Sequence, residues 1–478
     1  MKLPATIFRA YDIRGEYPDE LGEKSIELIG KAFGTFLQEK FVSSLTDAVC
    51  NAPTVAVGMD DRKSSPALAR AFIAGVTSTG CAVLDVGLSM TPIIHFVCCT
   101  QNVTAGVMVT ASHNPKQYNG LRLDYASAVP FYGDDIQSLY ELVEQGKFER
   151  RFGKCAKQDV FPLYLHFLGK KFSFAGGPKI VVHCGSGTTS AFAPEIFSKL
   201  GCAVVSRECL LNANFPNGVP NPENREFMKK LSSAVVAEKA FLGVAFDTDA
   251  DRLGVVDEKG AIYDADKLLL LFAHDLLTRK KGVKVVYDVK STGLLNQLVS
   301  GWGGSPQMIR TGHPYFVSAM KSGAVLGGEF SGHLYFGDDY FGYDDGIYAA
   351  CRLIDLVLRK GIPLSELVAA YPKRYHTSEI TILCPDEGKA DVIAVLESAT
   401  NFDFNFVSVS TIDGIRVQVT ESGWFLVRAS NTSPYLSVRV EGKDEAEARL
   451  MLSYVAKLLS HRKSINLENL NAAEFYES

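Results

Sequence analysis

Two stretches of the chain combine residue types that could do chemistry. Three aspartates alternate in Asp247-Thr248-Asp249-Ala250-Asp251, and Ser112 follows the apolar run 105–109 in the loop 110–115. Alternate carboxylates on a tight loop put hard oxygen ligands on one side of the backbone, which suits Mg²⁺. A serine hydroxyl is a poor nucleophile unless a base or a cation assists it. The two stretches therefore indicate a reactive serine supported by a divalent cation.

The aspartate stretch also fits part of a calcium-binding EF-hand pattern. Counted from Asp247, carboxylates stand at the first, third, fifth and twelfth positions, the last being Glu258. The sixth position, which favours glycine, is Arg252, and the flanking runs 243–246 and 253–256 are typical of strands rather than helices. We therefore favour a magnesium site over an EF-hand or a solvated acidic turn. Arg252, beside this site, can bind phosphate.

The loop around Ser112 does not match known serine hydrolase patterns. The G-x-S-x-G elbow is absent. His113 follows directly, but neighbouring side chains in an extended loop point to opposite sides, so we do not expect a simple Ser–His dyad. Taken alone, Ser112 could merely cap its own turn before Asn114-Pro115.

Two further loops contain groups that bind sugars and phosphates. In Gly328-Glu329-Phe330-Ser331-Gly332-His333, Glu329 can accept hydrogen bonds from adjacent hydroxyls and Ser331 can donate or accept. Near the end of the chain, guanidinium, hydroxyl and amide groups suited to a phosphate dianion come together in Arg428, Ser430, Asn431 and Thr432. The first of these loops could instead be a glycine-rich bend between two strands, and the second a plain turn.

In this order, the motifs resemble the α-D-phosphohexomutase superfamily, most closely its phosphomannomutase/phosphoglucomutase branch. The resemblance begins at Phe8-Arg9-Ala10-Tyr11-Asp12-Ile13-Arg14-Gly15 and spans nearly the whole chain. It implies that Ser112 is phosphorylated and that the phosphoserine joins Asp247, Asp249 and Asp251 in holding Mg²⁺. It also implies that Glu329 and Ser331 bind the sugar 3- and 4-hydroxyls, and that Tyr11 and Arg14 lie near the serine.

The reaction implied by the resemblance is reversible phosphoryl transfer between C1 and C6 of mannose or glucose phosphates. It proceeds through a phosphoserine and a 1,6-bisphosphate intermediate, with glucose 1,6-bisphosphate as activator. The expected partners are small sugar phosphates.

One position departs from the pattern of many relatives, which have Asn-Gly-x-Lys after the nucleophile. This chain has Asn119-Gly120-Leu121-Arg122, and arginine is always protonated, so Arg122 can position phosphate but cannot act as a base. The proton-transfer role then moves to His333, His313 or Lys290, and we favour His333 because it follows the sugar loop. Alternatively, a dissociative transition state needs little help from a base.

Three other functions remain as alternatives. A phosphoglucosamine mutase typically has glutamine where this chain has Phe330. Because of Arg122, the chain could also be a non-catalytic sugar-phosphate-binding protein. A metal-dependent phosphatase usually employs an aspartate nucleophile.

Asp61-Arg62, which precede a helix, fit a surface turn as well as a role in the site.

The elements that must position these loops follow an α/β pattern over 478 residues. Short apolar runs such as 54–58 and 179–183 alternate with amphipathic segments, which indicates α/β units with buried sheets. A helix is expected to start at Ser65-Pro66, with Ser65 as its cap. We predict three α/β domains with mixed sheets at 1–155, 156–259 and 260–372 and an α+β domain at 373–478. The resemblance implies that they surround a central cleft.

The bulk composition excludes several classes of protein. A net charge of -5 gives no overall attraction to nucleic acid or membrane surfaces. No run of about 18 apolar residues could span a membrane, and residues 1–6 lack the apolar core of a signal peptide. The ten cysteines form no C-x-x-C pair, so we expect structural thiols in a reducing cytoplasm. We expect a cytoplasmic monomer or homodimer.

Overall fold

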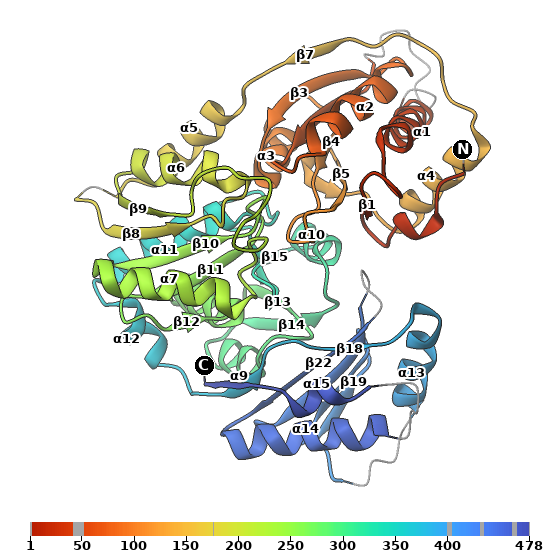
Figure 1. The fold of residues 1–478 in the computed structure, drawn as a ribbon. Coiled ribbons are helices and arrows are strands. Elements are labelled where there is room, and N and C mark those ends of the chain that lie inside the picture. Colours follow the sequence, from red (N-terminus) through yellow and green to blue (C-terminus); the bar gives the residue numbers. More distant parts are fainter. Residues whose placement is uncertain are drawn as a thin grey trace. The chain divides into compact units, whose positions relative to one another are not determined.

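The structure is a computed structural model that describes residues 2–41, 52–174, 176–398, 404–430, 435–460 and 466–477. The chain forms two compact units (Figure 1). The first consists of residues 1–262 and 332–363, and the second of residues 263–331 and 364–478. None of the described helices combines the length and the apolar character needed to cross a membrane.

The N-terminal sheet of the first unit is mixed, with strand order β1-β5-β4-β2-β3-β7 and β6 beside β5. Its strands are β1 (Ile13–Glu16), β2 (Thr54–Met59), β3 (Ala82–Leu88), β4 (Ala105–Val109), β5 (Tyr118–Tyr125), β6 (Val129–Pro130) and β7 (Cys155–Lys157). Because β2 and β4 are parallel neighbours, their carboxyl ends bring the segments that start at Asp60 and Thr110 to one edge. Ser112 lies on the second of these segments.

Apolar faces of helices cover this sheet. The helices are α1 (Glu23–Phe41), α2 (Ser65–Thr77), α3 (Thr91–Thr100) and α4 (Asp134–Gln145). Helices α1, α2 and α4 share one buried cluster with the strands, while α3 packs on β2 and β4. The predicted cap at Ser65 is wrong in position: Ser64 precedes α2, and the Ser65 hydroxyl instead donates to the Asp60 carboxylate. Proline does occupy the first turn, as expected.

The second sheet of this unit has strand order β12-β11-β10-β8-β9. Its strands are β8 (Lys179–His183), β9 (Ala203–Arg207), β10 (Leu242–Phe246), β11 (Leu253–Asp257) and β12 (Ile262–Tyr263), and nearby helices are α5 (Phe161–Lys171), α6 (Ala193–Lys199), α7 (Arg225–Glu238) and α11 (Gly346–Lys360). Helix α7 packs on β8, β10 and β11. Strands β10 and β11 are antiparallel, and the turn between them holds the three aspartates. These flanking strands rule out the helices of an EF-hand.

Helix α11 begins where the chain passes very close to the aspartate turn. A Cβ atom at Gly346 would lie 2.5 Å from the carbonyl oxygen of Arg252, so only glycine fits there without displacing the turn. The side chain of Asp345 caps the helix by accepting from the backbone nitrogen of Tyr348. The residue just before this cap, Asp344, therefore has a fixed place beside the aspartate turn.

The second unit begins with a parallel arrangement of β14, β13 and β15 in that order. These strands are β13 (Lys284–Asp288), β14 (Ser305–Ile309) and β15 (Ala324–Gly328), and the helices are α8 (Ala265–Arg279), α9 (Leu294–Gly301), α10 (His313–Lys321) and α12 (Leu364–Ala369). The short strand β16 (Leu334–Phe336) belongs to the first unit. The sugar loop 328–333 follows β15 directly.

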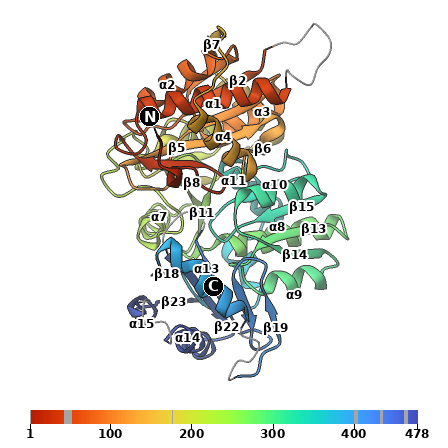
Figure 2. The same cartoon turned by 90° about the vertical axis from the view of Figure 1, so that its right-hand side faces the viewer.

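The C-terminal sheet is antiparallel, with order β19-β20-β21-β22-β17-β23 and β18 beside β22. Its strands are β17 (Tyr375–Thr377), β18 (Ile380–Leu383), β19 (Ser408–Ser410), β20 (Ile415–Gln418), β21 (Trp424–Ala429), β22 (Tyr435–Gly442) and β23 (Phe475–Glu477), with helices α13 (Asp386–Ser398), α14 (Glu445–Ser460) and α15 (Glu468–Asn471). Figure 2 shows α13 and α14 beside this sheet, and both contact β21 and β22. The predicted α+β character of this segment is confirmed.

Two buried arginines join the C-terminal sheet to the rest of the second unit. The Arg416 guanidinium lies 3.7 Å from the centre of the Trp424 ring and donates to the carbonyl oxygen of Val289 at 2.6 Å. Arg439 lies 3.7 Å from the centre of the Phe330 ring and forms an ion pair with Asp266 at 3.7 Å. Arg439, on β22 of the C-terminal sheet, therefore holds Phe330 of the sugar loop in place.

Candidate active site

Ser112 lies in a turn that the sequence holds in an unusual backbone conformation. Its φ angle is +47°, in the left-handed region that residues other than glycine rarely adopt, and such strain concentrates at functional sites. Its backbone nitrogen donates to the Thr110 hydroxyl at 2.9 Å. Arg62 donates from Nη2 to the Ser112 carbonyl oxygen at 2.6 Å. The surrounding side chains therefore determine where the hydroxyl points.

The Ser112 hydroxyl faces two groups that polarise it. Its Oγ donates to Asp247 Oδ2 at 2.8 Å and lies 3.1 Å from His113 Nδ1. The expectation that Ser112 and His113 point to opposite sides is thus wrong, because the left-handed backbone at Ser112 turns the two side chains toward one another. Burial, with Arg252 and Arg14 nearby, lowers the pKa of His113 well below its usual range, so the imidazole is neutral.

The three aspartates form a compact group of ligand atoms. One oxygen from each of Asp247, Asp249 and Asp251 lies within 4.8 Å of the others, and all three side chains are buried. Burial and mutual repulsion raise the pKa of Asp247 and of Asp249. One oxygen each of Asp249 and Asp251 is buried without a hydrogen-bond partner. Crowded, partly unsatisfied carboxylates fit a hard divalent cation, so this group could hold a metal ion.

A threonine from α3 supports this group from outside. The Thr91 hydroxyl donates to Asp249 Oδ2 at 2.6 Å, and the Thr91 backbone nitrogen donates to the Asp249 carbonyl oxygen at 3.0 Å. Both residues are buried. Helix α3 and the aspartate turn are therefore joined beside the candidate metal ligands.

Arg122 lies in a buried cluster of charged groups rather than at a free phosphate position. Its Nη1 donates to Asp251 Oδ2 at 2.8 Å, and its Nη2 donates to Asp344 Oδ1 at 2.9 Å. Burial disfavours its charge, but Asp344, Asp124 and Asp251 raise the pKa of Arg122 well above the usual value. The buried His95 adds a contact of 3.3 Å to Asp124. Arg122 thus contacts Asp251, one of the candidate metal ligands, directly.

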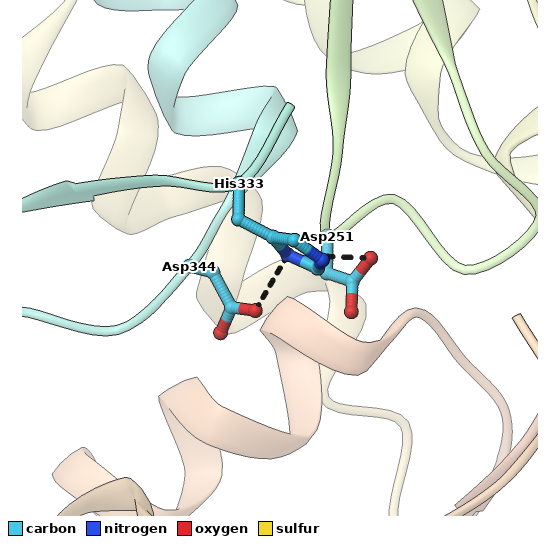
Figure 3. A group of neighbouring side chains, drawn as sticks. All are labelled: Asp251, His333 and Asp344. Carbon is cyan, nitrogen blue, oxygen red and sulfur yellow. Dashed lines mark ion pairs between the residues drawn. The ribbon is translucent and has the colours of Figure 1, made fainter. Parts of the chain in front are cut away.

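His333 lies between two carboxylates (Figure 3). Its Nδ1 is 2.9 Å from Asp344 Oδ2 and 3.8 Å from Asp251 Oδ1. Its Nε2 accepts from Arg252 Nε at 3.1 Å, and Arg252 also forms an ion pair with Glu223 at 2.8 Å. Since Nε2 accepts a hydrogen bond, Nδ1 bears the proton, and this N–H lies beside the Asp344 carboxylate.

Tyr11 and Arg14 belong to the entry segment of the N-terminal sheet. Arg14 is on β1, opposite Gly120 on β5, and its Nε donates to Asp12 Oδ2 at 2.9 Å. Strand β5 continues to Arg122, so the entry segment and the arginine cluster share one strand pair. Tyr11 lies two residues before the start of β1.

In the second unit, Glu329 and His313 meet at one loop. Glu329 Oε2 accepts from the backbone nitrogen of Gly312 at 2.9 Å, and His313 begins α10 immediately after. Glu329, Ser331 and His313 are all buried. The backbone nitrogen of Phe330 donates to Asp288 Oδ1 at 3.3 Å. The sugar loop is therefore fixed by the ends of β13 and β14.

Lys290, a candidate base from the sequence, is engaged in a partly buried ion pair. Its Nζ lies 2.9 Å from Glu379 Oε2. Burial alone would raise the pKa of Glu379, but Lys290 and its hydrogen bond hold that pKa at about 2. The pair joins the end of β13 to the start of the C-terminal sheet, which is a structural task that keeps the ammonium charged.

The phosphate loop is described in part. Arg428, on β21, donates from Nε to Asp413 Oδ2 at 3.0 Å, and the same carboxylate oxygen accepts from the Thr311 backbone nitrogen at 3.1 Å. Ser430 follows, and its carbonyl oxygen accepts from Lys389 Nζ at 2.7 Å. Asn431 and Thr432 lie outside the described residues.

Sequence reasoning did not assign a role to several residues that the structure places at the site: Arg62, Thr91, Glu223 and Asp344. Of the two interpretations left open for Asp61-Arg62, a surface turn and a role in the site, the surface turn is wrong for Arg62, because Arg62 is buried. The sequence feature that could have indicated a role for Arg62 is the run Asp60-Asp61-Arg62 directly after a strand. The loop that contains Ser112 leaves the sheet at the same edge. For Asp344, the only signal was a pair of aspartates before a helix.

The geometry agrees with comparisons to known proteins. Models of the phosphoglucomutase/phosphomannomutase family match alpha/beta/alpha domain I at residues 5–150, domain II at 162–260, domain III at 264–375 and the C-terminal domain at 379–458. A phosphomannomutase/phosphoglucomutase of Pseudomonas aeruginosa is 39% identical over 446 residues, which are 93% of each chain. A phosphoglucomutase of Neisseria gonorrhoeae is 36% identical, covering 92% of this chain and 94% of its own length.

A solved structure agrees as well. The phosphoglucomutase/phosphomannomutase family protein of Burkholderia thailandensis has a TM-score of 0.89 to this chain at 33% identity. The match covers 97% of this chain and 99% of that one.

Proposed function

The chain belongs to the phosphoglucomutase/phosphomannomutase family, and we propose that it transfers a phosphoryl group reversibly between O1 and O6 of mannose and glucose phosphates. The observation that supports this proposal best is the contact of 2.8 Å between the Ser112 hydroxyl and Asp247 in the three-aspartate group. It places a nucleophile beside a candidate cation site. Phosphoryl transfer depends chiefly on such positioning and charge stabilisation.

In this proposal, Ser112 holds the phosphoryl group in the resting enzyme. The bond between Ser112 Oγ and phosphorus breaks as a bond forms to the free hydroxyl of the hexose phosphate, which gives a 1,6-bisphosphate. After the sugar reorients, Ser112 Oγ takes the other phosphoryl group, and the product leaves. Glucose 1,6-bisphosphate would activate the enzyme by phosphorylating Ser112.

Asp247, Asp249 and Asp251, with the phosphoserine, would hold Mg²⁺, which when bound neutralises charge on the phosphoryl oxygens. In the absence of phosphate, Asp247 and His113 both face the Ser112 oxygen and keep it aligned. Glu329 and Ser331 bind the sugar hydroxyls, and Arg428 and Ser430, with Asn431 and Thr432, bind the phosphate that is not transferred.

For proton transfer at the sugar hydroxyl we retain His333 over His313 and Lys290. Its Nδ1 faces Asp344, so the lone pair is on Nε2, which is the atom that a base must present. Arg252 donates to that nitrogen at 3.1 Å in this state, so Arg252 must turn toward substrate phosphate before Nε2 can accept a proton. Lys290, paired with Glu379, is the weakest of the three candidates.

The test is conversion of mannose 1-phosphate and glucose 1-phosphate to their 6-phosphates, with Mg²⁺ and a catalytic amount of glucose 1,6-bisphosphate. Glucosamine 1-phosphate serves as a third substrate. We expect turnover of at least one of the first two sugars, loss of turnover with a chelator, and near-background activity of Ser112→Ala. Release of inorganic phosphate without a 6-phosphate product, or an active Ser112→Ala variant, contradicts the proposal. Preference for glucosamine 1-phosphate would identify the sister enzyme instead.

A further inference from the structure

Asp344 is a buried carboxylate that contacts two residues of the proposed site, Arg122 and His333. It accepts from Arg122 twice, at 2.9 Å on Oδ1 and at 3.2 Å on Oδ2. Its Oδ2 also lies 2.9 Å from His333 Nδ1. Burial would raise the pKa of Asp344, but Arg122 and His333 hold that pKa well below its usual range. Asp344 is therefore a fixed anion between two cationic or polarisable partners.

Through Arg122, this anion reaches the metal loop. Arg122 Nη1 donates to Asp251 Oδ2 at 2.8 Å and to Asp344 Oδ2 at 3.2 Å, so one nitrogen bridges the two carboxylates. The planar guanidinium presents its donors in a rigid fork, which fixes the direction of both bonds. Asp251 can rotate only if Arg122 moves, and Arg122 can move only if it leaves Asp344.

A second metal ion among Asp251, His333 and Asp344 is the competing interpretation, since their ligand atoms lie close together (Figure 3). The position of Arg122 argues against it. A guanidinium already supplies positive charge to both carboxylates, and it is buried there with them. A cation added to this group would meet Arg122 at contact distance.

We propose that Asp344 is a positioning residue, which orients the metal ligand Asp251 through Arg122 and orients His333 directly. The part of this inference that concerns His333 and turnover rests on the proposed function. The part that concerns Asp251 needs only the metal loop. Partners one bond behind a metal ligand commonly change metal affinity or activity by about 10–100-fold when they are replaced.

The adjacent residue offers a matched control. Asp345 is equally buried, but its carboxylate accepts from Tyr164 at 2.7 Å, from Tyr340 at 2.6 Å and from the Tyr348 backbone nitrogen at 2.8 Å. Neither Arg122 nor Asp251 is among these three partners. Asp345→Asn makes the same chemical change one residue away, and asparagine also caps helices well.

The experiment measures Mn²⁺ binding to the full chain by electron paramagnetic resonance, without any sugar, and thermal unfolding of each variant. Asp344→Asn is expected to weaken Mn²⁺ binding about 10–100-fold, while Asp345→Asn changes it by less than about threefold even if it unfolds earlier. Equal Mn²⁺ affinity of Asp344→Asn and the parent protein overturns the proposal, and so does an equal loss in both variants.

If Asp344→Asn does not fold, the same Mn²⁺ measurement on Arg122→Lys tests the positioning role. Lysine keeps a positive charge but loses the forked bond, so Mn²⁺ binding should weaken by an intermediate factor of about 3–10. Unchanged Mn²⁺ binding overturns the inference. Because no sugar is present, weaker Mn²⁺ binding with no mutase activity in the parent protein would support the positioning role and reject the proposed function. An active parent protein with unaltered Mn²⁺ binding in the variants would support the proposed function and reject the positioning role.

Discussion

The Arg62 guanidinium binds the backbone of Ser112, the proposed nucleophile: its Nη2 lies 2.6 Å from the Ser112 carbonyl oxygen. The same nitrogen reaches the Asn114 carbonyl oxygen at 2.6 Å, and Nη1 reaches those of Pro115 and Tyr118 at 2.8 and 3.1 Å. One side chain thus satisfies four carbonyl groups of a single turn. The positive φ of Ser112 is maintained by this set of bonds.

Replacing Arg62 with lysine should therefore lower activity without unfolding the protein. A lysine ammonium cannot span four carbonyl groups, so the serine would shift, and a displacement of about 1 Å can cost about 100-fold in rate. We expect kcat to fall by a factor of about 10–100 in the mutase assay, with an unchanged circular dichroism spectrum. Arg70→Lys, on the exposed face of α2, the helix that follows Arg62, is the control. A kcat within a factor of about two of the parent value would show that the turn keeps its shape unaided.

Thr91→Val should weaken metal binding. The Thr91 hydroxyl donates to Asp249 Oδ2 at 2.6 Å and thereby lowers the pKa of that carboxyl, opposing the effect of burial. A hydrogen bond to a charged group contributes about 1.5 kcal/mol, so Mn²⁺ affinity should fall about tenfold. Isothermal titration can measure this change. Thr100→Val removes a hydroxyl at the other end of α3, bonded only to the Phe96 carbonyl oxygen, and should leave affinity unaltered.

Glu379→Gln should destabilise the protein at neutral pH and change its acid sensitivity. Lys290 holds the pKa of Glu379 at about 2, below the ordinary glutamate value of 4.5. A lowered pKa means that the stabilisation is present above pH 4.5 and is lost as the pH falls toward 2. Because the pair is only partly buried, removing one partner should cost at most about 3 kcal/mol.

Urea unfolding between about pH 2 and pH 7 tests this expectation. The free energy of unfolding should be lower in Glu379→Gln than in the parent protein at pH 7, and the two curves should converge at the acid end. Glu366→Gln, on the exposed face of α12, should follow the parent curve throughout. Parallel curves for Glu379→Gln and the parent protein would mean that the ion pair adds nothing to stability.

Asp413→Ala should raise the KM for hexose phosphates more than it changes kcat. Asp413 Oδ2 orients Arg428 and also holds the backbone nitrogen of Thr311, next to the loop that Glu329 contacts. Loss of this charged acceptor should raise KM about tenfold. Asp391→Ala, on the exposed face of α13, is the control. An equal fall in kcat with constant KM would instead place Asp413 in the chemical step.

Local patterns in the sequence were enough to predict much of this architecture. The apolar runs at 54–58 and 105–109 became β2 and β4, and the aspartates lie in a turn between the two predicted strands. Strand periodicity and turn composition are local properties, so they can be recognised without tertiary information. The motifs themselves identified the family.

Contacts between distant residues could not be predicted in this way. The sequence shows that Arg122 stands where many relatives have lysine. It does not show that Arg122 donates hydrogen bonds to Asp344, 222 positions later. It likewise gave no reason to expect a left-handed backbone at Ser112, which depends on Arg62 and Thr110 and which brings His113 toward the hydroxyl. Backbone strain of this kind persists only because tertiary contacts impose it.

The metal loop and the Arg122–Asp344 pair differ in when they can arise during synthesis. The three aspartates gather in a hairpin between adjacent strands, and hairpins close within about 1–10 μs. Domains fold largely in the order of translation, at about 5–20 residues per second. Asp344 leaves the ribosome seconds after the hairpin. The nascent chain therefore presents the three candidate metal ligands before Asp344, the proposed positioning residue, has been synthesised.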